Sequence, residues 1–211
     1  MTNLEALEWR YATKKFDAEK IVPEEKVTIL KKSFNLTPTS YGLQPAKLVV
    51  VKDQQTKEAL YEHSAKQQQV LTASHILIFC IETEIDDFFI EENFKRIKEI
   101  RETPDDILAP FRDFLLKDFR KKSRLEKEDW ATKQVYLAIG NMLTVCAAEK
   151  IDACPMEGFN TKKFDEVLQL KNKGLKSKLI LPIGYRAEDD IFADFKKVRR
   201  PLDDVIVDFN N

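Results

Sequence analysis

Residues 130–149 read WATKQVYLAIGNMLTVCAAE, and this stretch decides which kind of fold the chain can adopt. No charged residue occurs between Gln134 and Ala148. A helix without a charged face is buried on nearly all sides, so we expect residues 130–149 to form the central helix of a folded core. The uncharged run is shorter than the roughly 18 residues that a membrane-spanning helix needs.

The segments on either side of this helix predict a sheet surrounded by helices. The runs HILIFCI (75–81) and LILPI (179–183) are typical of strands covered on both faces. Pro182 predicts that the second run is an edge strand or contains a bulge. Further strands are expected at 48–51 and 151–156. Helices are expected at 3–11, from Pro23 to the turn at 37–42, at 53–64, as a surface pair within 86–127, and from the cap residue Asn160 to 168. This order predicts an α+β or α/β fold.

Composition excludes several classes of protein. The chain has 211 residues, with 35 Lys and Arg against 36 Asp and Glu, and 43% of the residues are hydrophobic. The apolar fraction is too high for a disordered chain, and the balanced charge argues against a nucleic-acid partner. We expect a single domain over residues 1–211. Three dispersed cysteines, two histidines without metal-ligand spacing and an acidic start predict reduced core thiols, no metal site and a cytoplasmic location.

Three polar clusters could bind a ligand. In RYATKKF (10–16), Arg10 and Lys14 are four residues apart and would share one side of a helical turn, which would suit an anion. The turn TPTSYGLQP (37–45) offers hydroxyls and amides to a phosphate or a heteroaromatic ring. In PMEGF (155–159), a glycine after an acid allows close approach of a flat ligand. Taken singly, each cluster could also be a solvated face or an ordinary turn, as could the basic tail KKVRRP (196–201).

The sequence lacks the motifs of several common enzymes. It contains no dinucleotide-binding G-x-G-x-x-G, no phosphate-binding Walker loop and no G-x-S-x-G. The adjacent acids at 86–87 and 189–190 would point in different directions and are interpreted as surface charge. If the chain is an enzyme, a cofactor supplies the difficult chemistry.

Taken in chain order, these segments resemble the oxygen-insensitive NAD(P)H nitroreductase family, which includes FMN-dependent nitroreductases and dihydropteridine reductase-like proteins. The resemblance extends from about Leu7 to Pro201. The segments that carry it are RYATKKFD (10–17), TPTSYGLQP (37–45), QQQVLTASH (67–75), EDWATKQVYLAIGN (128–141), CPMEGF (154–159), LPIGYR (181–186) and KVRRP (197–201).

The resemblance implies an α+β nitroreductase-like fold with a central, mainly antiparallel sheet, a helical excursion at about 86–127, and an intertwined homodimer with FMN at its interface. It implies cofactor contacts from Arg10, Tyr11, Ala12, Lys14, Lys66, Gln67, Gln69, Met156, Glu157, Gly158, Lys197 and Arg199. Thr39, Ser40 and Gly42 would approach the flavin from the partner subunit. The acceptor would be met by Phe114, Leu116 or Phe119.

The activity implied by the resemblance is a flavoprotein oxidoreductase that uses NAD or NADP in reduced form. Hydride would pass to flavin N5 and from there to a nitroaromatic, a quinone or a similar acceptor, in a ping-pong reaction without a catalytic side chain. The ammonium of Lys14 and the backbone of Glu157 would tune the flavin, because a nearby cation stabilises negative charge on the reduced ring. The alternatives are a flavin-binding or storage protein without turnover, and a specialised flavin, enone or dehalogenating reductase on the same scaffold.

Overall fold

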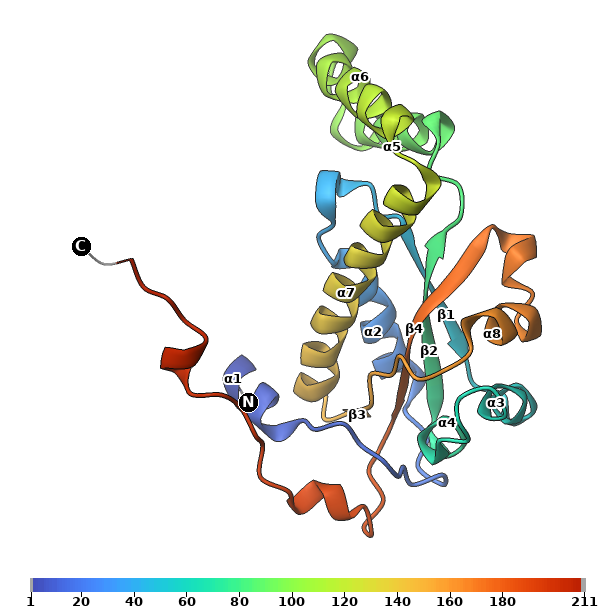
Figure 1. Cartoon of the computed structure of the whole chain (residues 1–211), viewed down its shortest axis with the longest axis vertical. Coiled ribbons are helices and arrows are strands. Elements are labelled where there is room, and N and C mark those ends of the chain that lie inside the picture. Colours follow the sequence, from blue (N-terminus) through green and yellow to red (C-terminus); the bar gives the residue numbers. More distant parts are fainter. Residues whose placement is uncertain (1, 210–211) are drawn as a thin grey trace.

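The computed structural model describes residues 2–209 and has a four-stranded antiparallel sheet at its centre. The strand order is β1-β2-β4-β3, which confirms the expected α+β fold with an antiparallel sheet. The strands are β1 (Ala46–Val51), β2 (His75–Glu82), β3 (Asp152–Ala153) and β4 (Leu175–Gly184). One face is covered by α2 (Glu24–Leu36) and α7 (Arg124–Ala148), and the other by α3 (Gln54–Tyr61), α4 (Gln68–Thr72) and α8 (Thr161–Val167) (Figure 1).

The two faces of the sheet make two hydrophobic cores. Along β2, Leu77 and Phe79 point toward α2 and α7, whereas Ile76 and Ile78 point toward α3, α4 and α8. This alternation follows from the two-residue period of a strand. All four side chains are fully buried, so the continuous apolar run of β2 is explained by burial on both faces.

Helix α7 differs from the prediction in two ways. It begins at Arg124, six residues before Trp130, because Ser123 and Glu126 form a capping box at its start. It is also not buried on all sides in a single chain: Tyr136 and Leu137 are 48% and 54% exposed. The uncharged stretch therefore has two faces. One packs on the sheet, and the other is exposed to solvent in the single chain.

The expectation that Pro182 marks an edge strand is wrong, because β4 lies between β2 and β3. Pro182 is tolerated for a local reason. Its carbonyl accepts a hydrogen bond from the amide of Cys154 at 3.0 Å, just beyond the end of the two-residue strand β3. Only the reverse hydrogen bond of this pair is missing, because proline has no N–H, and the antiparallel pairing resumes at Met156 and Ile180. The sheet irregularity lies where Phe79 and Cys80 of β2 face Leu179 and Ser177 of β4, so Lys178 is the extra residue, just before the run 179–183.

The remaining elements lie at the periphery. Helices α5 (Asp87–Arg101) and α6 (Asp105–Lys121) form the expected pair and project beyond the sheet at the top of Figure 1. Helix α1 (Asn3–Trp9) lies at the opposite end, and Asn160 caps α8 as predicted. Short 3-10 turns occur at η1 (Ser40–Gly42), η2 (Leu170–Lys173), η3 (Ile191–Asp194) and η4 (Leu202–Asp204).

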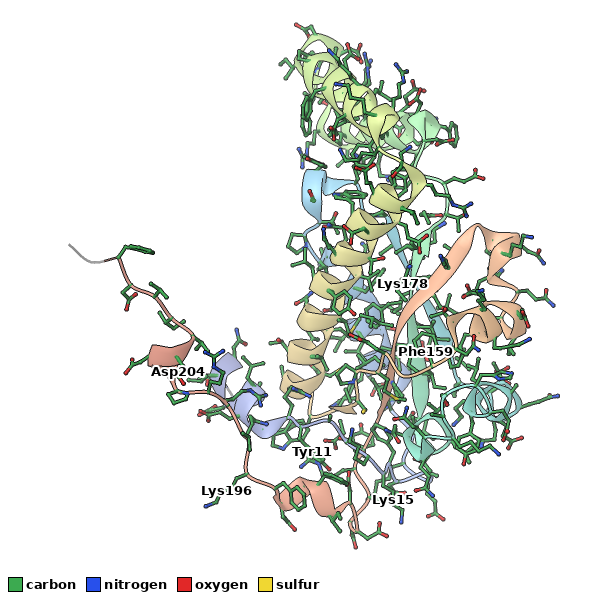
Figure 2. The ribbon with its side chains drawn as sticks, viewed as in Figure 1. Tyr11, Lys15, Phe159, Lys178, Lys196 and Asp204 are labelled. Atoms are coloured by element: carbon green, nitrogen blue, oxygen red, sulfur yellow. The ribbon has the colours of Figure 1, made fainter. Side chains whose placement is uncertain are left out.

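The C-terminal tail extends away from the body of the chain. The red segment that includes Asp204 runs outward past α1 (Figures 1 and 2). Its apolar side chains are exposed, including Val198 at 86% and Phe209 at 93%. Within residues 2–209 no helix is long and apolar enough to cross a membrane. The three cysteines are free and buried, in line with the prediction of core thiols.

Candidate functional site

A cleft of about 320 Å³ lies between the segment after α1 and the C-terminal tail. Arg10, Tyr11, Ala12 and Lys14 line it from one side, and tail residues line it from the other: Phe192, Phe195, Lys196, Lys197, Val198 and Arg199. The structure thus brings together cations from the two ends of the chain, as the resemblance implies.

The prediction that Arg10 and Lys14 share one side of a helical turn is wrong. Helix α1 ends at Trp9, and Arg10 has an extended backbone with φ −72° and ψ 145°. Ala12 forms a parallel bridge to Ala153, and the chain then bends at Lys14. Arg10 and Lys14 nevertheless line the same cleft, together with Tyr11 and Ala12 between them.

The cations of this cleft lack acidic partners. Among residues 2–209, Arg10, Lys197 and Arg199 form no ion pair, and the buried Nε of Arg10 has no hydrogen-bond partner. Burial lowers the pKa of Arg10, and the neighbouring charge of Arg199 lowers it further. Burial, followed by the charges of Arg10 and Arg199, also lowers the pKa of Lys197, whose ammonium donates to the Arg10 carbonyl. This concentration of positive charge suits a small dianion.

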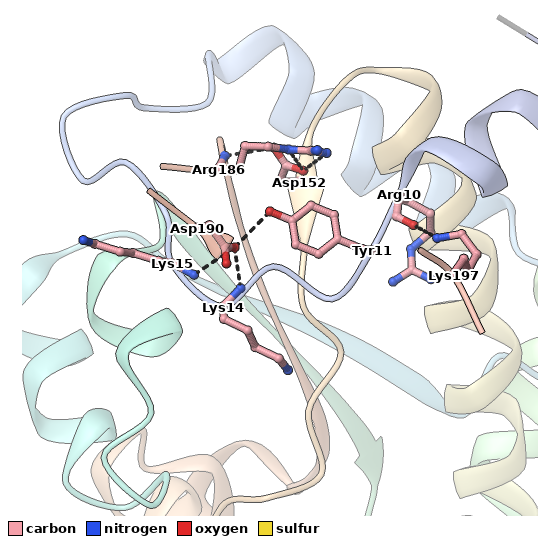
Figure 3. Close-up of polar contacts among 8 residues, drawn as sticks. All are labelled: Arg10, Tyr11, Lys14, Lys15, Asp152, Arg186, Asp190 and Lys197. Carbon is pink, nitrogen blue, oxygen red and sulfur yellow. Dashed lines mark hydrogen bonds and ion pairs between the residues drawn. The ribbon is translucent and has the colours of Figure 1, made fainter. Parts of the chain in front are cut away.

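Asp190 holds the two sides of the cleft together (Figure 3). Its carboxylate accepts hydrogen bonds from the Tyr11 hydroxyl at 2.9 Å and from the backbone amides of Lys14 and Lys15 at 2.9 and 3.3 Å. Asp190 is only 4% exposed. The interpretation of residues 189–190 as surface charge is therefore correct for Asp189, which pairs with Lys15, and wrong for Asp190.

An ion pair between Arg186 and Asp152 also supports Tyr11. Arg186 forms two hydrogen bonds to one carboxylate oxygen of Asp152, at 2.6 and 2.9 Å. The guanidinium lies 4.5 Å from the ring centre of Trp9 and 4.6 Å from that of Tyr11. Such cation–π contacts add rigidity to the segment that carries Arg10 and Lys14. Burial, followed by the hydrogen bond to Asp190, raises the pKa of the Tyr11 hydroxyl, which keeps it a neutral donor.

A row of polar groups continues from Lys14 toward β4. The Lys14 ammonium lies 3.9 Å from the sulfur of Cys154, and the Gln69 amide nitrogen lies 4.0 Å from the same sulfur. Gln69 donates to Gln67, which in turn donates to the carbonyl of Gly158 at 3.2 Å. A Cβ on Gly158 would lie 3.2 Å from the Gln67 amide nitrogen, so a larger residue there would require the Gln67 side chain to shift by a few tenths of an ångström. Sequence reasoning did not identify Cys154 as part of this row.

The turn formed by Met156, Glu157 and Gly158 closes the row. Met156 exchanges two backbone hydrogen bonds with Ile180 of β4, at 2.9 and 3.1 Å. The next two amides, of Glu157 and Gly158, donate no hydrogen bond to any residue within 2–209. Adjacent free donors of this kind are available to acceptor atoms on the edge of a flat ligand.

Four residues predicted to contact the cofactor lie outside this arrangement. Lys66 is exposed and forms an ion pair with Glu62 at 3.4 Å. Thr39, Ser40 and Gly42 belong to the η1 turn, where the Ser40 amide donates to Gln134 of α7. From Gln134 to the end of α7 near α1 is roughly 20 Å at the usual 1.5 Å rise per residue. Within one chain, this turn therefore contacts the middle of α7 and lies well away from the end of α7 that packs near α1.

The predicted acceptor residues lie on α6 and differ in exposure. Phe119 is 1% exposed and Leu116 is 8% exposed, so both are core residues in this chain. Phe119 packs edge-on against Trp130 at 5.0 Å. Phe114 is 54% exposed and stacks on Phe111 at 6.3 Å. Of the three, Phe114 is the one with a surface available to a ligand.

Comparisons with known proteins identify the family and the fold of the chain. A sequence model described as "Nitroreductase family" matches residues 7–185. The oxygen-insensitive NAD(P)H nitroreductase of Enterobacter cloacae is 30% identical over 211 residues, covering 94% of this chain and 95% of that protein. A structure from Exiguobacterium sibiricum, solved in complex with FMN, has a TM-score of 0.83 at 18% identity, covering 98% of this chain and 97% of that one. The enone reductase CLA-ER has a TM-score of 0.81 at 18% identity, covering 97% and 96%.

Proposed function

Because the chain belongs to the nitroreductase family and has its α+β fold, we propose that it is an FMN-dependent oxidoreductase that uses NAD(P)H. The observation that carries this proposal is the cleft where Arg10, Lys197 and Arg199 meet without an acidic partner among the described residues. A flavin mononucleotide phosphate is close to doubly negative at neutral pH, so two or three cations would nearly neutralise it. The unpartnered Nε of Arg10 is a donor that such a phosphate would satisfy.

The residues beyond the cations fit the flavin ring. The ring carries several hydrogen-bonding atoms along one edge, and the protein offers Lys14, Gln69 and the free amides of Glu157 and Gly158, which contacts through Cys154 and Gln67 link into one row. None of these groups forms an ion pair with another described residue, so none would lose one on binding a ligand. The donor set therefore matches a flat, electron-poor heterocycle that carries a phosphate on a flexible chain.

The protein residues position the cofactor and set its charge. Bound FMN would supply two-electron chemistry, with NAD(P)H as the hydride donor and an electron-poor compound such as a nitroaromatic or a quinone as the acceptor. The ammonium of Lys14 stabilises negative charge on the ring, and the amides of the 156–158 turn orient it. No histidine, thiol or metal is required. Donor and acceptor would use the same exposed surface in turn, which gives ping-pong kinetics.

We further propose that the protein forms a homodimer. The uncharged part of α7, residues 134–148, leaves Tyr136, Leu137 and Gly140 exposed, and the tail projects apolar side chains away from its own chain. Exposed apolar faces of this kind mark protein–protein contacts. A second copy would cover both features. It would also bring its own Thr39, Ser40 and Gly42 toward the cleft, which those residues do not reach within one chain.

The experiment is an anaerobic titration of the purified, FMN-reconstituted protein. We expect one FMN per subunit, bleaching of the oxidised flavin absorbance by NADH or NADPH, and return of the colour on adding a nitroaromatic or a quinone. Failure to bind FMN would contradict the proposal. Binding without bleaching would indicate a flavin store, and return of colour only with an enone would indicate a specialised reductase on the same scaffold.

A further inference from the structure

The turn formed by Met156, Glu157 and Gly158 is held from three sides. On the first side, Met156 pairs with Ile180 of β4 through two backbone hydrogen bonds. On the second, the carbonyl of Gly158 accepts from Gln67, at the start of α4. On the third, the carboxylate of Glu157 accepts a hydrogen bond from the hydroxyl of Tyr136 on α7 at 2.6 Å. A sheet strand, a loop and the central helix thus converge on a turn of three residues.

The hydrogen bond between Tyr136 and Glu157 is short and charge-assisted. An ionised acceptor makes such bonds stronger than those between neutral groups. The hydrogen bond to Glu157 raises the pKa of the Tyr136 hydroxyl, so the phenol stays protonated as the donor. Both side chains are exposed in the single chain, and neither has another polar partner among residues 2–209. Among the described residues, the contact between the Tyr136 hydroxyl and the Glu157 carboxylate is thus the one polar interaction of either group.

Tyr136 lies on the open face of α7. It is 48% exposed, and its neighbour Leu137 is 54% exposed. The backbone of α7 at this point is rigid because the opposite face, including Val135 and Ile139, is packed into the core. A side chain fixed to the body of the fold in this way can hold a loop residue in place without moving itself.

We propose that Tyr136 is a positioning residue, which orients the Glu157 and Gly158 amides toward the cofactor by holding the Glu157 side chain. The proposal rests on the proposed function for the identity of the ligand, but not for the geometry of the turn. Without the Tyr136 hydroxyl, Glu157 would rotate freely between the anchors at Met156 and Gly158. The two free amides would then sample several directions, and binding would have to select one of them.

The test compares Tyr136→Phe, Glu157→Ala, the double variant, and Glu157→Gln, which keeps an acceptor oxygen. Tyr136→Phe keeps the aromatic ring on the α7 face, so sedimentation should show an unchanged assembly state. We expect Tyr136→Phe and Glu157→Ala each to weaken FMN binding about fivefold, the double variant to be no worse, and Glu157→Gln to bind nearly as well as the parent. The hydroxyl of Tyr61 makes no hydrogen bond with another described residue, so Tyr61→Phe is the matched control.

Two readouts separate positioning from a general loss of stability. The reduction potential of bound FMN should become more positive in Tyr136→Phe and stay at the parent value in Glu157→Gln. The reason is that an amide donor can bond to unprotonated flavin N5, which only the oxidised ring offers. NMR order parameters of the backbone amides in the cofactor-free protein should fall in Tyr136→Phe, with the change confined to the 156–158 turn.

The outcomes distinguish this inference from the proposed function. If the parent binds FMN but Tyr136→Phe has unchanged affinity and potential, the positioning role is wrong. If the parent binds no FMN, the proposed function is wrong, and the order-parameter measurement alone decides the inference. Unchanged order parameters at the turn in Tyr136→Phe would overturn it in either case.

Discussion

The carboxylate of Asp190 accepts a hydrogen bond from the Tyr11 hydroxyl at 2.9 Å, although the two residues are 179 positions apart in the chain. The same oxygen accepts the backbone amides of Lys14 and Lys15. This one buried side chain therefore fastens the segment after α1 to the start of the C-terminal tail. The cationic cleft exists because these two segments are held side by side.

Replacing Asp190 with alanine should destabilise the fold and weaken cofactor binding. Four donors, which are the Tyr11 hydroxyl and the amides of Lys14, Lys15 and Phe192, would lose a buried charged acceptor, and we expect a loss of about 3 kcal/mol in the free energy of unfolding. Urea unfolding monitored by circular dichroism measures it. The control is Asp189→Ala, because Asp189 is 69% exposed and pairs with Lys15 at the surface, where such pairs contribute about 0–1 kcal/mol. Equal effects of the two variants would contradict the role of Asp190.

Replacing Arg199 with alanine should weaken FMN retention about tenfold, since a phosphate would lose one of its cations. The effect should shrink as the salt concentration rises. Fluorescence titration of the cofactor-free protein measures both. Arg200→Ala is the matched control, because Arg200 donates to the carbonyl of Asp204 and does not line the cleft. A weakening of similar size in Arg200→Ala would place the phosphate elsewhere.

Replacing Lys14 with methionine should shift the reduction potential of bound FMN to more negative values. The variant removes the ammonium that stabilises negative charge on the reduced ring. We expect a shift of about 30 mV or more, equivalent to about 1.4 kcal/mol for a two-electron couple. Spectroelectrochemical titration measures it. Lys15→Met should leave the potential unchanged, because the Lys15 side chain points to Asp189. An unchanged potential in Lys14→Met would remove Lys14 from this role.

The stability of the protein should decrease in mild acid because of His75. This side chain is 1% exposed and its Nδ1 lies 2.8 Å from the Ser74 hydroxyl. Burial, aided by the charge of Lys52, lowers the pKa of His75 below its ordinary value. Below about pH 6.5 the unfolded chain binds a proton that the native protein does not, so stability falls by up to about 1.4 kcal/mol per pH unit until the lowered pKa is reached. Urea unfolding between about pH 5 and 7 should show this slope, and His75→Gln should reduce it.

A charge on the open face of α7 should dissociate the proposed dimer. Leu137→Glu places a carboxylate at the centre of the apolar surface formed with Tyr136 and Gly140. Burying an unpaired charge in an interface costs several kcal/mol, so the variant should sediment as a monomer at concentrations where the parent is a dimer. Lys162→Glu on exposed α8 is the control. Dimerisation that survives Leu137→Glu would move the interface to another surface.

The secondary structure could be predicted largely from the sequence. The strands β1 and β2, the cap at Asn160 and the helix opened by Pro23 follow from local periodicity and from residues at helix ends. The predicted start of α7 was six residues too late. The capping box of Ser123 and Glu126 begins the helix in a charged segment, which has no apolar stripe to indicate a helix. The edge position expected for Pro182 was wrong because β3 pairs with the outer side of β4, and local sequence does not reveal which strands pair.

By itself, the sequence determined which residues carry the chemistry of the candidate site. Arg10, Lys14, Gly158 and the basic tail are recognisable because charge, glycine and turn residues have local signatures. Only the tertiary structure decided which of them meet. Asp190 looks like one half of a surface acidic pair, and Tyr136 looks like one apolar position in a buried helix. Their partners lie 179 and 21 positions away, and the contacts arise because backbone packing brings distant segments within hydrogen-bonding distance. No local pattern in the chain encodes those pairings.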